Sequence, residues 1–334
     1  MKVISLFSGA GGLDLGFKRA GFTTVFANEY DKTVWPTYKA NFTGVPLNTG
    51  SIVDIQVDTL PPADGVIGGP PCQSWSEAGA HRGIDDKRGQ LFSEYERILE
   101  HVNPKFFLAE NVSGILSARH KAAFDVIIKR FEGLGYRVAH RMLRASNFGV
   151  PQDRDRVIIV GIRSDLGCEF VFPGPVGRAP TLRDAINNMP KPRCNRSPNK
   201  RVDHGDVPNH EFLDGSFSPI YMSRNRVRGW DQPSFTIQAG ARHAPIHPSA
   251  PKMEKVDKDE FRFKRGSEVK YRRMSVRECA CIQTFPPNYK FEYERIIDGY
   301  KMVGNAVPVK FAYHLAKAVK LALAGASGVR RGKR

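Results

Sequence analysis

The chain has 334 residues, of which 41% are hydrophobic and 25% are charged, so it can form one large or two smaller globular domains. No stretch approaches the roughly 20 apolar residues of a membrane span, and the apolar start of the chain is too short for a signal peptide, so we expect a cytoplasmic protein with no membrane partner. The formal net charge of +17 favours a polyanionic partner such as nucleic acid.

The first half of the chain alternates short apolar segments with stretches of helical periodicity. The predicted strands are residues 3–7, 25–27, 52–55, 65–67, 106–109, 138–142 and 157–162. Apolar residues recur at helical spacing over 13–20, 91–102 and 126–134. This alternation predicts an α/β fold with a doubly wound, mostly parallel sheet.

The composition changes near Pro173, after which proline, glycine, asparagine and arginine are dense and helical periodicity is poor. Helical patterns return at 275–280 and again at 309–323. We therefore expect a catalytic and cofactor-binding domain made of residues 1–172 and 288–326, with a smaller domain of residues 173–287 inserted into it. The last residues, 327–334, are basic and predict a disordered tail.

A glycine-rich turn, Phe7–Gly12, follows the first predicted strand and opens a helix. Glycines at such a turn let the backbone approach a ligand at the carboxyl ends of the strands. Glu29 ends the next strand, where such folds place an acceptor for ribose hydroxyls, and Asp54 could accept from an adenine amino group. Phe7 and Tyr30 could stack on the base. These residues favour S-adenosylmethionine, with a nicotinamide dinucleotide as the alternative.

Cys72 follows a short buried strand that the run Gly68–Pro71 ends abruptly. A thiol presented at a strand end beside a ligand turn can attack an electron-poor ring, although most cysteines are inert and buried. The five cysteines form an odd, scattered set, which argues against a disulfide framework. Cys279 and Cys281 lack a second pair of ligands at a suitable spacing, so we expect no metal site.

Several motifs occur in an order that resembles DNA cytosine-C5 methyltransferases over nearly the whole chain. They are Phe7–Gly12, Gly69–Gln73, Glu110–Val112, Gln152–Arg156, Arg277–Ala280, Gln283–Pro286 and Gly304–Pro308. One departure is Val53, because the family usually has glycine before the aspartate at position 54. The segments 223–228, 233–239 and 246–248 are similar to the bacterial enzymes that modify GGCC in restriction–modification systems. This resemblance implies methylation of the inner cytosine of GGCC in duplex DNA and a partner restriction endonuclease.

The resemblance also implies roles for individual residues. Cys72 would add to C6 of a cytosine flipped out of the helix, Glu110 would contact N3 and the exocyclic amine, and Arg154 would hold O2 with support from Arg156. The cofactor would be S-adenosylmethionine. Its expected binding residues are Phe7, Ala10, Gly11, Gly12, Leu13, Glu29, Tyr30, Asp54, Ile55, Pro70, Leu91, Asn305 and Val307.

Arg226, Arg228 and Arg242 are the predicted base readers, because guanine offers two acceptors that arginine matches in the major groove. Gln73 and Ser76 are expected on DNA, in a polar loop that closes over the flipped base. We expect a monomer. The alternatives are a transfer-RNA cytosine-C5 methyltransferase on the same scaffold, a DNA-binding protein without activity, and an enzyme resembling thymidylate synthase.

Overall fold

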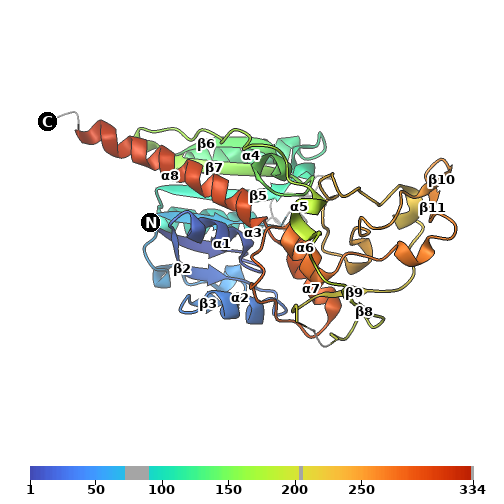
Figure 1. Ribbon diagram of the computed structural model, residues 1–334. Coiled ribbons are helices and arrows are strands. Elements are labelled where there is room, and N and C mark those ends of the chain that lie inside the picture. The colour runs from blue at the N-terminus through green and yellow to red at the C-terminus, as the bar shows by residue number, and fades with distance from the viewer. Residues whose placement is uncertain (72–89, 203–205, 332–334) are drawn as a thin grey trace.

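A computed structural model describes residues 1–71, 90–202 and 206–331, and its core is one seven-stranded sheet (Figure 1). The spatial order of the strands is β3-β2-β1-β4-β5-β7-β6. Strands β1 to β5 run parallel, and β7 and β6 add in antiparallel fashion. The strands are β1 (Lys2–Leu6), β2 (Thr23–Asn28), β3 (Leu47–Asn48), β4 (Gly65–Gly68), β5 (Phe106–Val112), β6 (Tyr136–Arg144) and β7 (Asp155–Arg163). The predicted doubly wound, mostly parallel sheet is confirmed.

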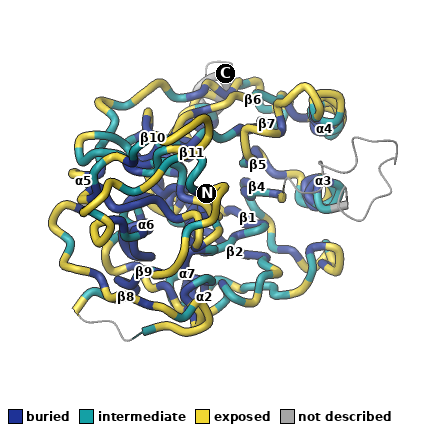
Figure 2. The backbone as a smooth tube through the Cα atoms, turned by 90° about the vertical axis from the view of Figure 1, so that its right-hand side faces the viewer, coloured by how far each residue is buried: buried dark blue, intermediate teal, exposed yellow. Residues whose placement is uncertain are grey.

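Helices bury both faces of this sheet, which explains the continuous apolar runs of its strands. Helices α1 (Gly12–Arg19) and α8 (Val309–Arg331) lie on one face, and α3 (Gln90–Val102) and α4 (Lys121–Gly133) lie on the other (Figure 1). Successive residues of β5 point to opposite faces: Phe106 packs with α1 and α8, whereas Phe107 packs with α3 and α4. The central strands are consequently buried along most of their length (Figure 2).

The winding direction of the sheet reverses between β1 and β4. The chain passes from β1 to β2 and β3 on one side, then enters β4 and continues to β5 on the other. Parallel sheets form a crevice at the carboxyl ends of their strands where the order reverses. The turn after β1 and the residues after β4 therefore meet at one edge of the sheet, and the end of β5 lies beside them.

The remaining elements form a second body beside this edge (Figure 1). Helices α5 (Leu182–Ile186), α6 (Val276–Ile282) and α7 (Ile296–Asn305) share one hydrophobic cluster with α2 (Trp35–Asn41). Two small sheets complete it, formed by the strand pairs β8 (Arg193–Asn195) with β9 (Glu211–Leu213) and β10 (Glu254–Asp257) with β11 (Glu260–Arg262). The division of the chain at residues 172 and 288 stays a prediction.

One predicted strand is wrong. Residues 52–55 do not join the sheet, because Ile52–Asp54 forms a turn of 3₁₀ helix and the third strand is the earlier pair Leu47–Asn48. The hydroxyl of Ser51 accepts a hydrogen bond from Val53 N at 3.3 Å and so caps this turn. The guanidinium of Arg97 donates to the carbonyl oxygens of Ile52 and Ile55. The backbone groups that a strand would use are thus engaged locally.

Helix α8 is longer than the sequence pattern predicted. It begins at Val309, packs Phe311 and Leu315 against the sheet, and continues to Arg331, past the start of the tail expected at 327–334. Disorder of that tail stays a prediction. Alanine and leucine dominate 321–324, and both favour continuation of a helix. Neither α8 nor another helix of the described residues combines the length and apolarity needed to cross a membrane.

Candidate active site

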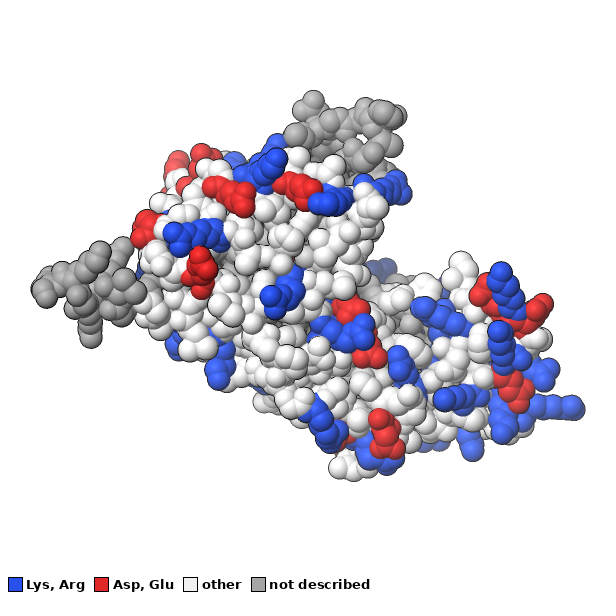
Figure 3. All heavy atoms as spheres, turned by 90° about the horizontal axis from the view of Figure 1, so that it is seen from above, with Lys and Arg blue, Asp and Glu red and all other residues white. Residues whose placement is uncertain are grey.

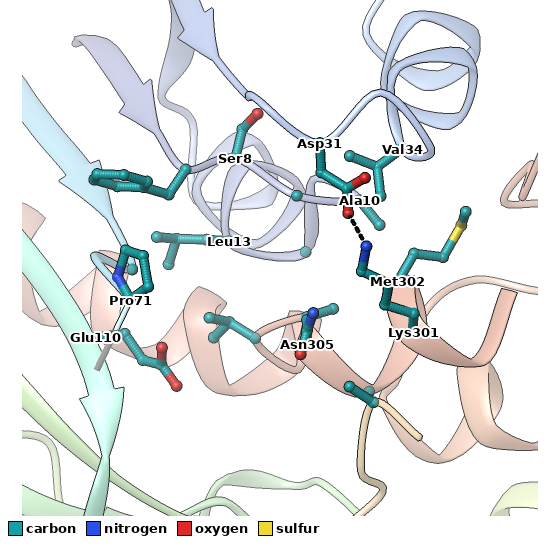
Figure 4. Close-up of a pocket in the computed structure, with 18 of the residues that line it drawn as sticks. Ser8, Ala10, Leu13, Asp31, Val34, Pro71, Glu110, Lys301, Met302 and Asn305 are labelled. Carbon is teal, nitrogen blue, oxygen red and sulfur yellow. Dashed lines mark ion pairs between the residues drawn. The ribbon is translucent and has the colours of Figure 1, made fainter. Parts of the chain in front are cut away.

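A cavity of about 660 Å³ lies at the carboxyl ends of β1, β4 and β5 (Figure 4). This volume is typical of a site for a small organic ligand. The sheet supplies one wall through the turn after β1, residues 69–71 and the end of β5. Residues 236–239 and 301–307 supply the opposite wall, so the second body closes the crevice predicted by the sheet topology.

The turn after β1 brings backbone close to this cavity. Phe7 and Gly9 have positive φ values of 53° and 52°, which bend the chain sharply at the end of the strand. A side chain at Gly12 would place its Cβ 2.3 Å from the carbonyl oxygen of Val307, so only glycine fits there. The hydroxyl of Ser8 lines the cavity, is buried, and has no hydrogen-bond partner within the described residues. It is therefore available to a ligand.

The end of β2 forms the acidic rim of the cavity. Glu29 accepts hydrogen bonds from the backbone N–H groups of Gly9 and Asp31, each at 2.7 Å. Burial raises the pKa of Glu29. Burial by itself would also raise the pKa of Asp31, but hydrogen bonds from Lys301 and Thr33 outweigh it and lower that pKa. A carboxylate has about four lone-pair sites, so Glu29 can still accept from a bound ligand.

Glu110 and Arg156 form an ion pair inside the cavity. Arg156 Nε lies 2.7 Å from Glu110 Oε1, and the two side chains are 13% and 12% exposed respectively. Val112 on β5 lies opposite Arg156 on β7, so Glu110 is its diagonal neighbour on the same face of the sheet. The side chain of Asn111 donates to the carbonyl oxygen of Pro70 at 3.0 Å. That bond fixes the segment leading to Cys72, which itself lies outside the described residues.

Arg154 holds three segments of the chain together. It is only 2% exposed, and its Nη1 and Nη2 donate at 3.0 Å to the carbonyl oxygens of Ile237 and Gly304. Burial, with a further contribution from the charge of Arg156, lowers the pKa of Arg154 to about 9. The guanidinium is therefore still charged at neutral pH.

Two buried glutamines that the sequence interpretation assigned no role complete this connection. Gln152 donates to Gln283 Oε1 at 2.8 Å and accepts from the N–H of Ile237 at 2.9 Å. Gln283 in turn donates to the carbonyl oxygen of Val303 at 2.9 Å. Both glutamines begin motifs of the family resemblance, Gln152–Arg156 and Gln283–Pro286, and this position was the signal that could have indicated their role. They fix the wall at 236–239 relative to the sheet and α7.

Gly304 is the point of closest approach between the two segments of this wall. A Cβ at Gly304 would lie 2.3 Å from the carbonyl oxygen of Gln238. We therefore expect Gly304→Ala to displace the wall and to lower the free energy of unfolding by about 1–3 kcal/mol. Urea denaturation measures this change. Gly133→Ala is the matched control, because a Cβ at Gly133 meets nothing within 4 Å, and equal effects of the two substitutions would contradict the argument.

Most of the predicted cofactor residues line the cavity, namely Phe7, Ala10, Gly12, Leu13, Glu29, Pro70, Asn305 and Val307. Five others are not among its lining residues, namely Gly11, Tyr30, Asp54, Ile55 and Leu91. Tyr30 is 73% exposed, and Asp54 is exposed on the 3₁₀ turn. Ile55 and Leu91 pack in the hydrophobic cluster under α3. Gly11 faces the ring of Phe42 instead.

Asp31 and Lys301 also line the cavity, and the sequence interpretation missed both (Figure 4). The sequence did hold signals that could have indicated them. Asp31 follows Glu29 by two residues, and Lys301 precedes Asn305 by four residues, which is about one helical turn. Among the residues that the structure describes, the ionisable side chains lining the cavity are then three acids and three bases. Within the part of the chain that the structure describes, no cluster of histidine, cysteine, aspartate and glutamate could hold a metal ion.

The predicted base readers differ in their surroundings. Arg226 donates to the carbonyl oxygen of Tyr221 at 2.6 Å and lies over its ring. Arg228 pairs with Asp153 at 3.1 Å, so its guanidinium is already engaged. Arg242 is exposed. Arg226 lines a second cavity of about 380 Å³, which shares Arg156 with the first.

The two other predicted DNA contacts, Gln73 and Ser76, lie outside the described residues, as does the whole predicted closing loop, residues 73–89. The surface of the second body is nevertheless strongly basic. Figure 3 shows lysine and arginine side chains gathered over the part of the molecule that carries β10 and β11. The exposed lysines and arginines of residues 224–270 include Arg224, Arg242, Lys252, Lys255, Lys258, Arg262, Lys264, Arg265 and Lys270.

The sheet and its crevice define an α/β fold with a ligand cavity at the carboxyl ends of its strands. A solved structure of a DNMT2 mutant from Spodoptera frugiperda shares this fold, with a TM-score of 0.70, 20% identity, and coverage of 96% of this chain and 99% of that one. Residues 1–321 match the model of the C-5 cytosine-specific DNA methylase family. The chain belongs to this family and is a DNA cytosine-C5 methyltransferase.

Closer relatives share more than half of the sequence. The chain is 53% identical to the Type II methyltransferase M.NgoPII of Neisseria gonorrhoeae, over 97% of this chain and 96% of that protein. It is 54% identical to the Type II methyltransferase M.FnuDI of Fusobacterium nucleatum, over 96% of this chain and 94% of that protein. Both similarities span the sheet and the second body alike.

Proposed function

We propose that this enzyme transfers a methyl group from S-adenosylmethionine to C5 of a cytosine that has been flipped out of duplex DNA. The observation that carries the proposal is the Glu110–Arg156 ion pair, which lines the same cavity as Pro70 and Pro71, the residues directly before Cys72 in the chain. A base within a duplex cannot reach a cavity at the end of a sheet unless it leaves the stack.

The residues around the cavity suit S-adenosylmethionine. Glu29 has acceptor capacity left for ribose hydroxyls, and Ser8 offers a buried hydroxyl that has no partner among the residues the structure describes. Asn305 lines the same cavity and can donate to the carboxylate of the cofactor. When bound, the cofactor supplies an electrophilic methyl group.

The protein's own residues would prepare the cytosine ring. The thiolate of Cys72 forms a bond to C6, which makes C5 nucleophilic. Glu110 hydrogen-bonds to N3 and the exocyclic amine and stabilises the protonated ring. We assign the O2 contact to Arg156, because its guanidinium pairs with Glu110 in the cavity, whereas Arg154 is 2% exposed and holds two backbone carbonyl groups with its terminal nitrogens. After methylation, loss of the C5 proton and departure of the Cys72 sulfur restore the aromatic ring.

We further propose that residues 173–287 read the DNA sequence and select the inner cytosine of GGCC. The resemblance of segments 223–228, 233–239 and 246–248 to enzymes of that specificity supports this proposal. The high identity to two Type II methyltransferases supports a role in protecting DNA from a restriction endonuclease.

Sequencing of methylated cytosines tests the proposal directly. Duplex DNA is incubated with the purified protein and S-adenosylmethionine, in parallel with transfer RNA. We expect a methyl group at the inner cytosine of each GGCC site and none on the RNA. Methylation of RNA alone would exclude the proposed substrate, whereas methylation at another DNA sequence would exclude only the GGCC assignment.

A further inference from the structure

An ion pair joins the two walls of the cavity at its rim. Lys301 Nζ on α7 lies 2.6 Å from Asp31 Oδ2, in the segment after β2 (Figure 4). Both side chains are partly exposed, at 43% for Lys301 and 29% for Asp31, and both residues line the cavity. Nothing in the chemistry described above uses this pair.

The position of the Asp31 carboxylate is fixed by its neighbours. Its Oδ1 accepts from the backbone N–H of Thr33 at 3.1 Å and from the Thr33 hydroxyl at 2.8 Å. Its own N–H donates to Glu29, the expected ribose acceptor. Lys301 lies one helical turn before Asn305 on α7. The pair is therefore anchored on both sides to residues that would hold the cofactor.

Each member of the pair also contributes one formal charge to the lining of the cavity. Among the described residues that line the cavity, the acids Glu29, Asp31 and Glu110 and the bases Lys301, Arg154 and Arg156 carry formal charges that cancel. S-adenosylmethionine carries a sulfonium cation, whereas the product left after methyl transfer is a neutral thioether that is otherwise identical. The free energy of binding these two molecules thus differs mainly through the charge that each one meets in the cavity.

We propose that the Asp31–Lys301 pair sets the preference of the cavity for the cationic methyl donor over its neutral product. This inference rests on the proposed cofactor. Loss of the ammonium group leaves the cavity with a net negative charge and favours the cation. Loss of the carboxylate leaves an unpaired ammonium group in the cavity and disfavours the cation. The two changes therefore act in opposite directions on the ratio of affinities.

Isothermal titration calorimetry with S-adenosylmethionine and with S-adenosylhomocysteine tests this inference without an activity measurement. The quantity compared is the Kd of the homocysteine compound divided by the Kd of the methionine compound. We expect this ratio to rise about three- to tenfold in Lys301→Met and to fall by a similar factor in Asp31→Asn, with smaller changes at high salt. The double variant should return close to the native ratio. Asparagine can still accept the hydrogen bonds from Thr33, so the loop keeps its conformation.

If the ion pair only held the two walls of the cavity together, each substitution would weaken the binding of both ligands by the same factor and leave the ratio of their Kd values constant. That result would overturn the inference. Lys105→Met is the matched control, because Lys105 forms an ion pair with Asp64 of the same length, 2.6 Å. This pair lies at the amino ends of β4 and β5, away from the cavity, so its loss should leave the ratio of Kd values unchanged. If the native protein binds neither ligand, the proposed cofactor is wrong and this inference falls with it. If the native protein binds both but the ratio does not move, only this inference fails.

Discussion

Replacement of Cys72 by serine should abolish methyl transfer while leaving DNA binding intact. A hydroxyl group is essentially never ionised at neutral pH, whereas a thiol near positive charge is partly thiolate and far more nucleophilic. We expect a loss of at least about 10³-fold in the rate of methyl transfer, which corresponds to ~4 kcal/mol of barrier. Incorporation of a labelled methyl group into duplex DNA measures this rate.

Covalent trapping provides the second readout for the same residue. In a duplex with 5-fluorocytosine at the target position, the ring cannot lose a proton from C5 after methylation, so the bond to sulfur persists. The native enzyme should form an adduct that survives denaturing electrophoresis, and Cys72→Ser should form none. Cys194→Ser is the matched control, because Cys194 is free and exposed and should be dispensable for both reactions. An adduct formed by Cys72→Ser would show that another group attacks the ring.

The parts of the fold that the sequence predicted are those dictated by local chemistry. Strands buried on both faces need continuous apolar runs, which made 106–109 and 157–162 recognisable without any partner being known. The glycine turn at 7–12 was a weak signal by itself, because many such turns are only tight turns, and it gained weight from Glu29 at the end of the next strand. The roles of Glu110 and Arg156 came from the family resemblance of their motifs, and the pairing of β5 with β7 then explains why the two side chains meet.

The parts that the sequence did not predict depend on contacts between distant segments. Asp31 and Lys301 are separated by 270 positions, and only the folded chain brings them together. Helix α7 was missed because glycine is unfavourable within helices. Its Gly299 and Gly304 serve instead to let the helix approach the ring of Tyr293 and the backbone of Gln238. Residues 52–55 have the composition of a strand, but the contact with Arg97 holds them in a turn.

The two arginines of the 152–156 motif illustrate the same limit. Alternation along the chain places Arg154 and Arg156 on one side, and both do line the cavity. The sequence alone could not assign their roles, because these depend on what each guanidinium meets. Arg154 donates to two backbone carbonyl groups, whereas Arg156 pairs with Glu110 inside the cavity.

Substitution of these arginines by methionine should therefore give opposite phenotypes. Arg154→Met leaves the carbonyl groups of Ile237 and Gly304 buried without donors, and we expect it to lower the free energy of unfolding by about 3 kcal/mol. Arg156→Met should change stability less but should slow methyl transfer by about 10²–10³-fold, because a donor to the reacting base is lost. Urea denaturation and single-turnover methyl transfer at saturating DNA separate the two effects.

The lysine variants sharpen this comparison. A lysine at 154 has the charge but cannot reach both carbonyl groups with a planar fork, so Arg154→Lys should remain destabilised. A lysine at 156 can still place one donor near Glu110, so Arg156→Lys should recover part of the lost rate. The assignment of O2 to Arg156 would be wrong if Arg156→Met kept its native rate while a folded Arg154 variant lost it. In that case the buried guanidinium would have to release its backbone partners when DNA binds, and hydrogen exchange at 236–239 would increase on addition of DNA.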